Sequence, residues 1–372
     1  MDTGNMTSKA EENLAKRKAR HHEICLDESL SIEGTRRDLD MLRFIHQADP
    51  GLHAEKISTQ LSFLGYTCRL PFFISCMTGG SVEGFRANKN LAQAAEEAGI
   101  PVGTGSIRIL HSQPDLLEHF QLKKLAPNVP VLANLSMVQL KELSHKWIYE
   151  TLDVLEVDAL VLHLNPGQEM FQKQGDRDFS HLLKHFSDFA QSKKLPLIIK
   201  ETGFGISPVL AKKYLEAGAD FIDLAGRGGS NWILIEDIRE PLDDFSKAEN
   251  FRDWGNDLCA SLMALQNQEG RILASGGIRS GMDIAKSIAL GAKMAGLALP
   301  FIRAEKEGQK KAILDLISQL ERELKIVMVL SGSKDIDSLG RAALMIDPSL
   351  ADSARQLANN GDWRNSGLIS SL

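Results

Sequence analysis

From about residue 70 to residue 300, short runs of apolar and β-branched residues alternate with segments that favour helix. Strands and helices that alternate in this way are typical of βαβ units, whose strands lie parallel in one sheet. Eight such runs can be counted, at residues 71–77, 100–106, 131–135, 159–164, 197–201, 221–225, 271–277 and 295–300. This count, with polar residues or glycines after every run, predicts an α/β protein built as a closed (β/α)8 TIM barrel. An open doubly wound sheet is the alternative architecture.

Three parts of the chain are expected. Residues 1–66 are charged and weakly periodic, with a helix-like stretch at 11–20, and they are interpreted as an N-terminal extension with a basic arm. Residues 67–340 hold the predicted barrel, and residues 341–372 are expected to form a polar C-terminal tail. After about residue 305 the chain is predicted to form one amphipathic helix.

Within the barrel region, residues 88–99 and 208–220 are predicted helices that stop near a glycine. Residues 228–258 are longer than a simple connection between a strand and a helix. We expect either a lid or an insertion in that stretch.

Charge and cysteine usage exclude several classes of protein. The formal charge of −6 and the pI near 6.0 provide no basic footprint for nucleic acid, so an anionic ligand must be bound by a local site. The first 23 residues lack an apolar signal region, and no apolar run reaches 18 residues, which predicts a cytoplasmic protein that does not bind membranes. The four cysteines form no CxxC pair and no zinc-type spacing.

Functional side chains of a (β/α)8 barrel lie at the C-terminal ends of its strands and in the loops that follow. MTGG at 77–80 follows the first predicted strand, and its glycines would let a flat ring approach the backbone. A tight turn without a ligand would have the same sequence pattern. GTGSIR at 103–108 follows the second predicted strand and either offers backbone N–H groups, Ser106 and Arg108 to an anion or forms a glycine turn with a surface arginine. Asn134 lies at the end of the third predicted strand. Its carboxamide either forms hydrogen bonds with the edge of a bound ring or forms hydrogen bonds with the backbone.

HLNPGQE at 163–169 ends the fourth predicted strand and contains an imidazole, two carboxamides and a carboxylate. Glu169 beside an anionic substrate implies a bridging cation such as Mg²⁺, because the two negative charges otherwise repel; a helix-capping role is the alternative. Lys200 closes the fifth strand, where it either stabilises negative charge at N1 of a reduced flavin or forms a structural salt bridge.

Glycine-rich loops follow the last three predicted strands. AGRGGSNW at 225–232 provides either a phosphate nest with Trp232 as a cover or a flexible linker. SGGIRSG at 275–281 and the segment 298–303 before a helix make the phosphate site expected of such a barrel. The basic cluster RKARHH at 17–22 is either a solvated face or an arm over the barrel mouth.

Taken in order, RKARHHE, MTGG, GTGSIR, LANL, HLNPGQE, IIKETGFG, AGRGGSNW and ASGGIRSG resemble the type 2 isopentenyl-diphosphate isomerase family over about residues 14–330. HLNPxQE and the early RK are specific to that family, whereas the other motifs occur in FMN barrels generally. The segment SLSIEGTRRDLD after Cys25 departs from the family pattern, and the tail beyond 340 matches no part of it.

The resemblance implies an isomerase of isoprenoid biosynthesis that moves a double bond of isopentenyl diphosphate, giving dimethylallyl diphosphate, with reduced FMN, Mg²⁺ and NADPH as the reductant of the flavin. It implies Gln168, His163 and Asn165 as catalytic residues and Glu169 as the Mg²⁺ ligand. A homo-oligomer, tetrameric or octameric, is also expected. The implied substrate-binding residues are Arg17, Lys18, His21, Ser106, Arg108 and Gln168. The implied FMN-binding residues are Met77, Thr78, Gly79, Ser106, Asn134, Lys200, Ser230, Gly277, Arg279, Ala298 and Leu299.

Other functions lack the residues that they need. An FMN-dependent α-hydroxy-acid oxidase, the leading alternative, needs a histidine base after the sixth strand, where AGRGGSNW has none. An inosine-monophosphate-dehydrogenase-like enzyme needs a cysteine in the same loop, and Cys259 lies in helix-like sequence instead. A non-catalytic scaffold that binds flavin or phosphate would keep the glycine loops but would not need Gln168 and Glu169.

Overall fold

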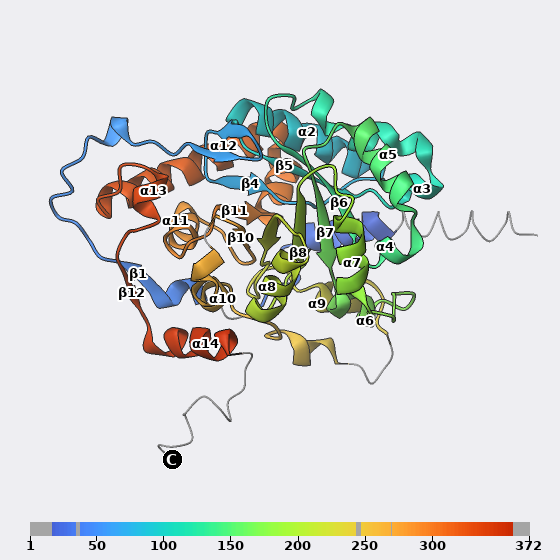
Figure 1. The fold of residues 1–372 in the computed structure, drawn as a ribbon. Helices are drawn as coiled ribbons and strands as arrows, with labels where there is room; N and C mark the ends of the chain where they lie inside the picture. Colours follow the sequence, from blue (N-terminus) through green and yellow to red (C-terminus); the bar gives the residue numbers. More distant parts are fainter. Residues whose placement is uncertain (1–16, 35–37, 243–246, 269, 360–372) are drawn as a thin grey trace, which may run out of the picture.

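The computed structural model describes residues 17–34, 38–242, 247–268 and 270–359, and Figure 1 shows their arrangement. Eight parallel strands form a closed barrel in the order β10, β11, β4, β5, β6, β7, β8, β9. The pairing of β9 with β10 closes the barrel. Their bounds are β4 Phe72–Ile74, β5 Val102–Ser106, β6 Val131–Ser136, β7 Ala159–Leu164, β8 Leu197–Glu201, β9 Phe221–Asp223, β10 Ile272–Ser275 and β11 Met294–Leu297. Each strand overlaps one of the eight predicted runs, so the (β/α)8 barrel is confirmed and the open sheet is wrong.

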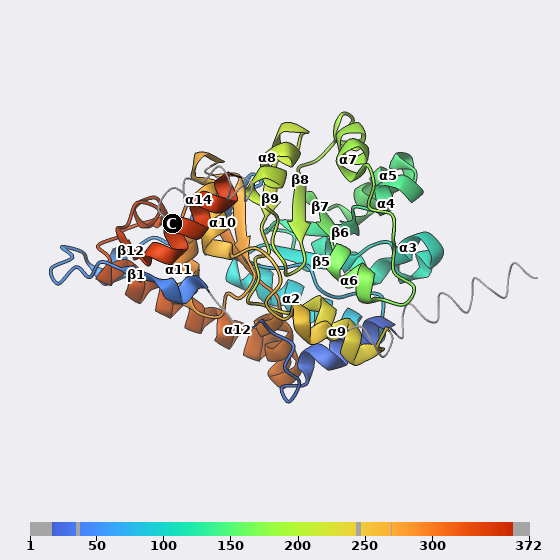
Figure 2. The ribbon, with the colours of Figure 1, turned by 90° about the horizontal axis from the view of Figure 1, so that it is seen from below.

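Helices cover the outside of the barrel (Figures 1 and 2). The α-helices are α2 Val82–Ala98, α3 Ile109–Ser112, α4 Gln139–Glu142, α5 His145–Leu155, α6 Pro166–Phe171, α7 Leu182–Ala190, α8 Pro208–Glu216, α9 Trp232–Arg239, α10 Leu258–Ala264, α11 Gly281–Ala289, α12 Leu299–Leu330, α13 Ile336–Leu339 and α14 Pro348–Ala358. Short 3-10 helices are η1 Asp38–Met41, η2 Ala54–Lys56, η3 Pro114–Phe120, η4 Leu122–Lys124, η5 Ala248–Phe251 and η6 Gln266–Gln268.

Helix α2 begins earlier than predicted because Ser81 caps it. The Ser81 hydroxyl accepts a hydrogen bond from the backbone N–H of Gly84, and the helix ends at Gly99 in the left-handed conformation. Helix α8 is capped in the same way by Ser207 and has Pro208 in its first turn.

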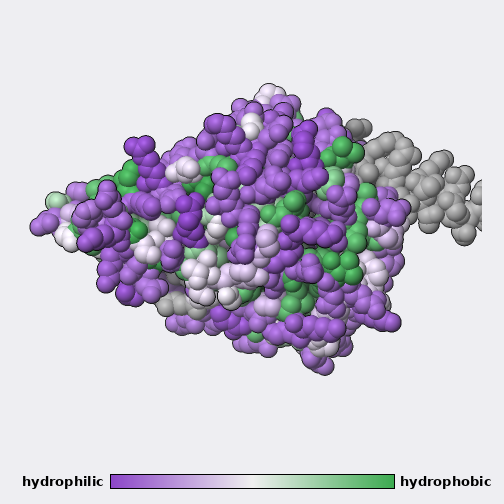
Figure 3. Space-filling model, turned by 90° about the horizontal axis from the view of Figure 1, so that it is seen from above, coloured by the Kyte–Doolittle hydropathy of each residue, from purple (hydrophilic) through white to green (hydrophobic). Residues whose placement is uncertain are grey.

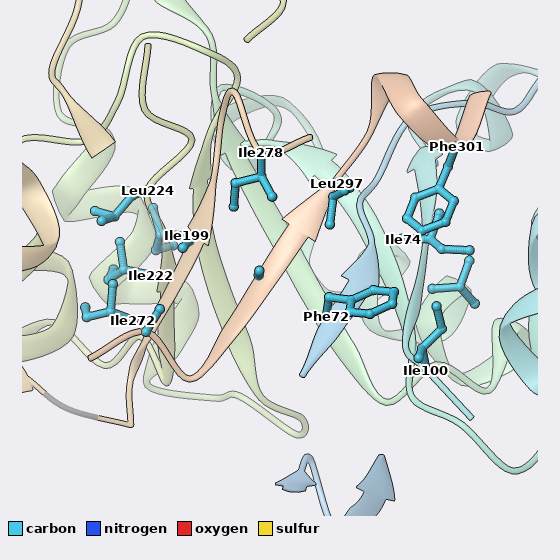
Figure 4. Close-up of a cluster of buried hydrophobic side chains, with 14 of the residues drawn as sticks. Phe72, Ile74, Ile100, Ile199, Ile222, Leu224, Ile272, Ile278, Leu297 and Phe301 are labelled. Atoms are coloured by element: carbon cyan, nitrogen blue, oxygen red, sulfur yellow. The ribbon is translucent and has the colours of Figure 1, made fainter. Parts of the chain in front are cut away.

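The core has two layers because successive strand residues point to opposite faces. Phe72 and Ile74 of β4 pack outward among the helices, where Figure 4 shows them with Phe301 of α12 and with isoleucines of β8, β9 and β10. Phe73 points into the barrel and belongs to a separate buried cluster with Leu132, Ile198 and other inward residues. The barrel is therefore a packed core and not a pore.

An antiparallel hairpin closes the end of the barrel opposite the C-terminal strand ends. Strands β2 Leu61–Phe63 and β3 Tyr66–Cys68 pair with each other, and Phe63 packs within the inner cluster, edge-on to Phe221. The Tyr66 hydroxyl donates to Asp158 Oδ1 at 2.8 Å, and Lys123 Nζ lies 2.7 Å from Asp158 Oδ2. This end of the barrel is thus sealed by apolar contacts and one half-buried ion pair.

The N-terminal helix predicted at 11–20 is seen from residue 17 and continues to residue 26; residues 11–16 lie outside the described residues. Figure 2 shows it beside α9, on the side of the barrel where the strands end. Helix α9 lies within the predicted lid or insertion at 228–258, in which residues 243–246 are not described.

The C-terminal part contains more structure than a polar tail. Helix α12 is kinked at Gly308 and Gln309, which have non-helical backbone angles. Strand β12 Leu344–Ile346 then pairs antiparallel with β1 Leu42–Phe44 of the extension. Helix α14 follows, with Leu350 buried against the core, and residues 360–372 lie outside the described part.

One face of the surface is mainly hydrophilic, with apolar residues in small groups, as Figure 3 shows. No helix among the described residues is long and apolar enough to cross a membrane.

Candidate functional site

A cavity of about 320 Å³ lies at the C-terminal ends of the barrel strands. All the side chains and glycines predicted for the site border it, although they come from all eight strand ends and from the N-terminal helix. They are Arg17, Lys18, His21, Met77, Thr78, Gly79, Ser106, Arg108, Asn134, His163, Asn165, Gln168, Glu169, Lys200, Ser230, Gly277, Arg279, Ala298 and Leu299. The structure thus brings these residues together, and their individual roles stay predictions.

Two pairs of backbone segments approach so closely that only glycine fits. A Cβ on Gly105 would lie 2.5 Å from the carbonyl oxygen of Thr78, so the C-terminal end of β5 lies directly against the loop after β4. A Cβ on Gly229 would lie 2.8 Å from the backbone nitrogen of Gly277, which joins the loops after β9 and β10. The second pair, next to the N-terminus of α12 at Ala298, presents backbone N–H groups of the kind that bind phosphate.

The floor of the cavity holds a buried ion pair. Lys200 Nζ lies 2.9 Å from Asp223 Oδ2 and donates to Ser275 Oγ at 3.2 Å. The Lys200 ammonium therefore borders the cavity and also forms the salt bridge that was its alternative interpretation. A cation at this place can stabilise negative charge on a ring that rests on the floor.

His163 is a neutral imidazole at physiological pH. Burial, followed by the positive charge of Lys200, lowers its pKa to about 4. Its Nδ1 lies 2.9 Å from Asn134 Oδ1, so the two predicted residues from β7 and β6 fix each other. A neutral His163 can hold a hydrogen bond but does not supply an acidic proton.

Helix α6 and the residue before it gather three of the four residues of HLNPGQE that were predicted for the site. Asn165, buried at its N-terminus, donates to Gln168 Oε1 at 3.1 Å and to Glu169 Oε1 at 2.8 Å. The other Glu169 oxygen accepts from the backbone N–H of Asp176 at 2.9 Å. Asn165 thereby positions both side chains, and Pro166 presets the first turn.

Glu236 is the centre of a polar network that it forms with His21, Gln168 and Arg239. The sequence analysis did not predict this residue. It comes from α9, is fully buried, and accepts from Gln168 Nε2 at 2.8 Å and from Arg239 Nε at 2.7 Å. His21 Nε2 of the N-terminal helix lies 3.0 Å from its Oε1. Burial alone would raise its pKa, but the bonds from His21, Gln168 and Arg239 outweigh burial and lower the pKa to about 2.

The only sequence signal for Glu236 is its position four residues after Trp232. These two residues lie on one face of a helix, and Trp232 was expected to cover a ligand. The Trp232 ring borders the cavity and lies edge-on to His21, with 5.3 Å between ring centroids. Trp232 and Glu236 therefore join the N-terminal helix to α9 above the cavity.

The basic arm lies against the cavity. Lys18 Nζ donates to the carbonyl of Gly79 at 3.0 Å and to that of Ser106 at 3.4 Å. Burial, with a smaller effect of the neighbouring Arg17, lowers the Lys18 pKa to about 8. Burial also lowers the pKa of Arg17, against the attraction of Glu236 and Glu169. Both cations are held in a dry place that favours an incoming anion.

Two other predicted arginines pair with carboxylates. Arg279 Nη2 lies 2.6 Å from Glu33 Oε2, and the same carboxylate is 3.7 Å from Arg303 Nη1. Arg108 lies 3.8 Å from Glu142, is about half exposed and also borders the cavity.

Several buried polar atoms around the cavity have no partner among the described residues. They are the hydroxyls of Ser136 and Thr202 and the amide oxygen of Asn165. Unpaired buried polar groups are costly, and a ligand with donor and acceptor edges would satisfy them. The lining therefore fits a polar ring system, as the FMN expectation requires.

Comparisons with known proteins agree with this geometry. A family model described as FMN-dependent dehydrogenase matches residues 124–346. A Borrelia garinii subsp. bavariensis protein named isopentenyl-diphosphate delta-isomerase is 41% identical over 330 residues, covering 88% of this chain and 92% of the relative. The chain belongs to the isopentenyl-diphosphate delta-isomerase family. A family member from Sulfurisphaera tokodaii is 36% identical, covering 91% of this chain and 93% of the relative.

Solved structures support the fold of this family member. A putative lactate oxidase from Pediococcus acidilactici matches with a TM-score of 0.63 at 18% identity, over 93% of this chain and 95% of the other. A flavocytochrome b2 variant with benzoylformate matches with a TM-score of 0.65 at 20% identity, over 92% of this chain and 87% of the other. At these identities the likeness concerns the barrel alone.

The structure also lacks, after β9, the residues that the two alternative enzyme functions need. The loop after β9 holds no histidine that could act as an oxidase base. Cys259 is fully buried in α10 and does not border the cavity, and burial raises its thiol pKa well above the ordinary value. Neither an oxidase base nor a cysteine nucleophile is therefore available after β9.

Proposed function

We propose that this protein isomerises isopentenyl diphosphate to dimethylallyl diphosphate with reduced FMN and Mg²⁺, as a step of isoprenoid biosynthesis. One observation carries the proposal: the basic N-terminal arm and the α6 residues Gln168 and Glu169 border the same cavity as the flavin-type glycine loops. A flavin barrel that acts on hydroxy acids has no need for this combination. The family relationship supports the same reaction.

FMN fits the inner part of the cavity. Its phosphate would meet the backbone N–H groups near Gly277 and Ala298, and its ring would rest between Met77 and the floor at Lys200. When bound and reduced, FMN supplies an electron-rich ring that can stabilise positive charge on an alkene and exchange a proton.

The diphosphate end of the substrate fits the outer part of the cavity. Arg17, Lys18 and Arg108 provide positive charge there, and Glu169 provides one carboxylate for Mg²⁺. No group of three or more histidine, cysteine, aspartate or glutamate side chains among the described residues could hold a metal alone. Mg²⁺ commonly binds through one or two carboxylates, substrate phosphates and water, so Glu169 is adequate once the diphosphate is present.

The reaction adds a proton to one carbon and removes another proton two carbons away, so its transition state is cation-like. The Gln168 carboxamide, which Asn165 and Glu236 fix, would hold the alkene end of the substrate. Trp232 borders this region and would exclude water, which would otherwise capture the cation. His163 contributes a fixed hydrogen-bonding group and no charge.

Three further features belong to the proposal. NADPH would reduce the flavin, although net turnover consumes no electrons. The active form would be a homo-oligomer, tetrameric or octameric, in the cytoplasm. Static light scattering of the purified protein tests the assembly, and a monomer would contradict it.

The decisive experiment follows isopentenyl diphosphate and dimethylallyl diphosphate under anaerobic conditions. We expect conversion only when FMN, a reductant and Mg²⁺ are all present. Consumption of an α-hydroxy acid with flavin reduction, and no allylic product, would instead establish the oxidase function.

A further inference from the structure

Three buried polar side chains on neighbouring strands form the floor of the cavity. Lys200 of β8, Asp223 of β9 and Ser275 of β10 are connected in a closed triangle: Lys200 Nζ lies 2.9 Å from Asp223 Oδ2 and 3.2 Å from Ser275 Oγ, and Ser275 Oγ donates to Asp223 Oδ1 at 2.5 Å. Strand alternation explains their direction. Ile199 and Leu224, their sequence neighbours, point outward into the core that Figure 4 shows.

The three groups occupy different depths. Lys200 and Ser275 border the cavity, whereas Asp223 does not and is only 2% exposed. Asp223 therefore lies behind the ammonium, out of reach of a ligand, and can act on it only through Lys200 and through its charge. The proposed function of FMN isomerisation assigns a role to Lys200 but none to Asp223 or Ser275.

The buried Asp223 carboxylate changes the electrostatic potential at the floor of the cavity. Charges act strongly over short distances in a protein interior, and here a negative charge offsets a positive one. Other groups near the floor respond to both charges. Burial raises the pKa of the Cys76 thiol to about 12, while Lys200 lowers that pKa and Asp223 raises it.

We infer that Asp223 and Ser275 are positioning residues that aim the Lys200 ammonium at the cavity and, through the Asp223 charge, set the reduction potential of bound FMN. This inference rests on FMN being the ligand of the proposed function. Two-electron reduction gives a flavin with more negative charge, which a lone cation would stabilise strongly. The Asp223 carboxylate offsets that cation and keeps the potential lower than Lys200 alone would set it.

The test measures the two-electron potential of FMN bound to the whole protein, by anaerobic titration against a reference dye and without any diphosphate. Asp223→Asn keeps the side-chain shape and removes the charge. We expect the ratio of dissociation constants for oxidised and reduced FMN to rise tenfold or more, a potential about 30 mV higher. Ser275→Ala keeps both charges and should change this ratio less than threefold, while broadening or shifting the flavin absorption band as the ammonium loses its direction.

Asp158→Asn is the matched control. Asp158 also pairs with a lysine, Lys123, at 2.7 Å, but at the end of the barrel that the hairpin seals. The same substitution there should leave the ratio within twofold of the wild type.

The outcomes are distinct. An unchanged ratio in Asp223→Asn, with FMN still bound, would overturn the inference and leave the ion pair as a structural feature. If that variant does not fold, Asp223→Ser replaces it, and loss of folded protein in both would equally assign Asp223 a structural role only. Wild-type protein that binds no FMN would overturn both proposals. A shifted potential without isomerase activity would overturn the proposed function alone.

Discussion

Replacing Glu236 by glutamine should expose how much the polar network above the cavity contributes to stability. The carboxylate is fully buried, and its pKa is about 2 instead of the ordinary 4.5. A depressed pKa stabilises the folded state at pH values above the unfolded pKa. This difference corresponds to about 3 kcal/mol at pH 7. Glutamine also turns its NH2 group toward one of the two donors, Gln168 or Arg239, which adds to the loss.

The pH dependence has a definite sign. The contribution is complete above about pH 5 and is lost as the pH falls toward the folded pKa, so the difference between wild type and Glu236→Gln should be about 1 kcal/mol smaller at pH 4 than at pH 7.

Urea unfolding of FMN-saturated protein, followed by tryptophan fluorescence, measures the difference. Glu240→Gln, directly after the C-terminus of the same helix, is the control, because Glu240 is 44% exposed and its bonds to Lys173 and Arg239 should contribute less than about 1 kcal/mol. Equal losses in the two variants, or a difference that does not change between pH 7 and pH 4, would refute this account of Glu236.

Four further outcomes are expected. Gln168→Ala should lower kcat by about 10² with KM changed only several-fold, whereas Arg108→Ala should raise KM first; steady-state kinetics decides, and a pure binding defect in Gln168→Ala would make it a pocket wall. Glu169→Gln should raise the Mg²⁺ concentration needed for half-maximal activity while FMN content, read by absorbance, stays unchanged. Since the Lys18 pKa is about 8, kcat/KM should fall as the pH rises above 8, and Lys18→Arg should abolish that fall; parallel pH profiles would contradict it. Oxidised enzyme should be inactive until dithionite or NADPH is added anaerobically, and equal activity in both states would exclude reduced FMN from the mechanism.

The strands and the mouth of the barrel could be predicted because their signals are local. Each apolar run forms one strand, and the rule that functional groups follow strands in a parallel barrel places Lys200 and Asn134 at its mouth from the sequence alone. The HLNPGQE segment was recognisable because its polar residues lie within one helical turn of a strand end.

The parts that could not be predicted depend on partners distant in sequence. Glu236 is an ordinary glutamate of an amphipathic helix until His21 and Gln168 meet it in space. Asp223 is one polar residue in an apolar run, and its role can be recognised only from its ion pair with Lys200 of the neighbouring strand. The strand β12 is too short to be recognised by itself, because a three-residue strand is defined by its pairing with β1.

That pairing joins residues from near the two ends of the chain. Leu42 is fully buried and faces Ile346 across the two-stranded sheet, so the N-terminal segment acquires its edge partner only after residues 344–346 have been synthesised. On the ribosome, all eight barrel strands therefore emerge before this contact can form. A nascent chain arrested before residue 344 would hold every strand of the barrel while Leu42 still lacked its partner. The β1–β12 sheet can therefore form only after the strands of the barrel have been synthesised.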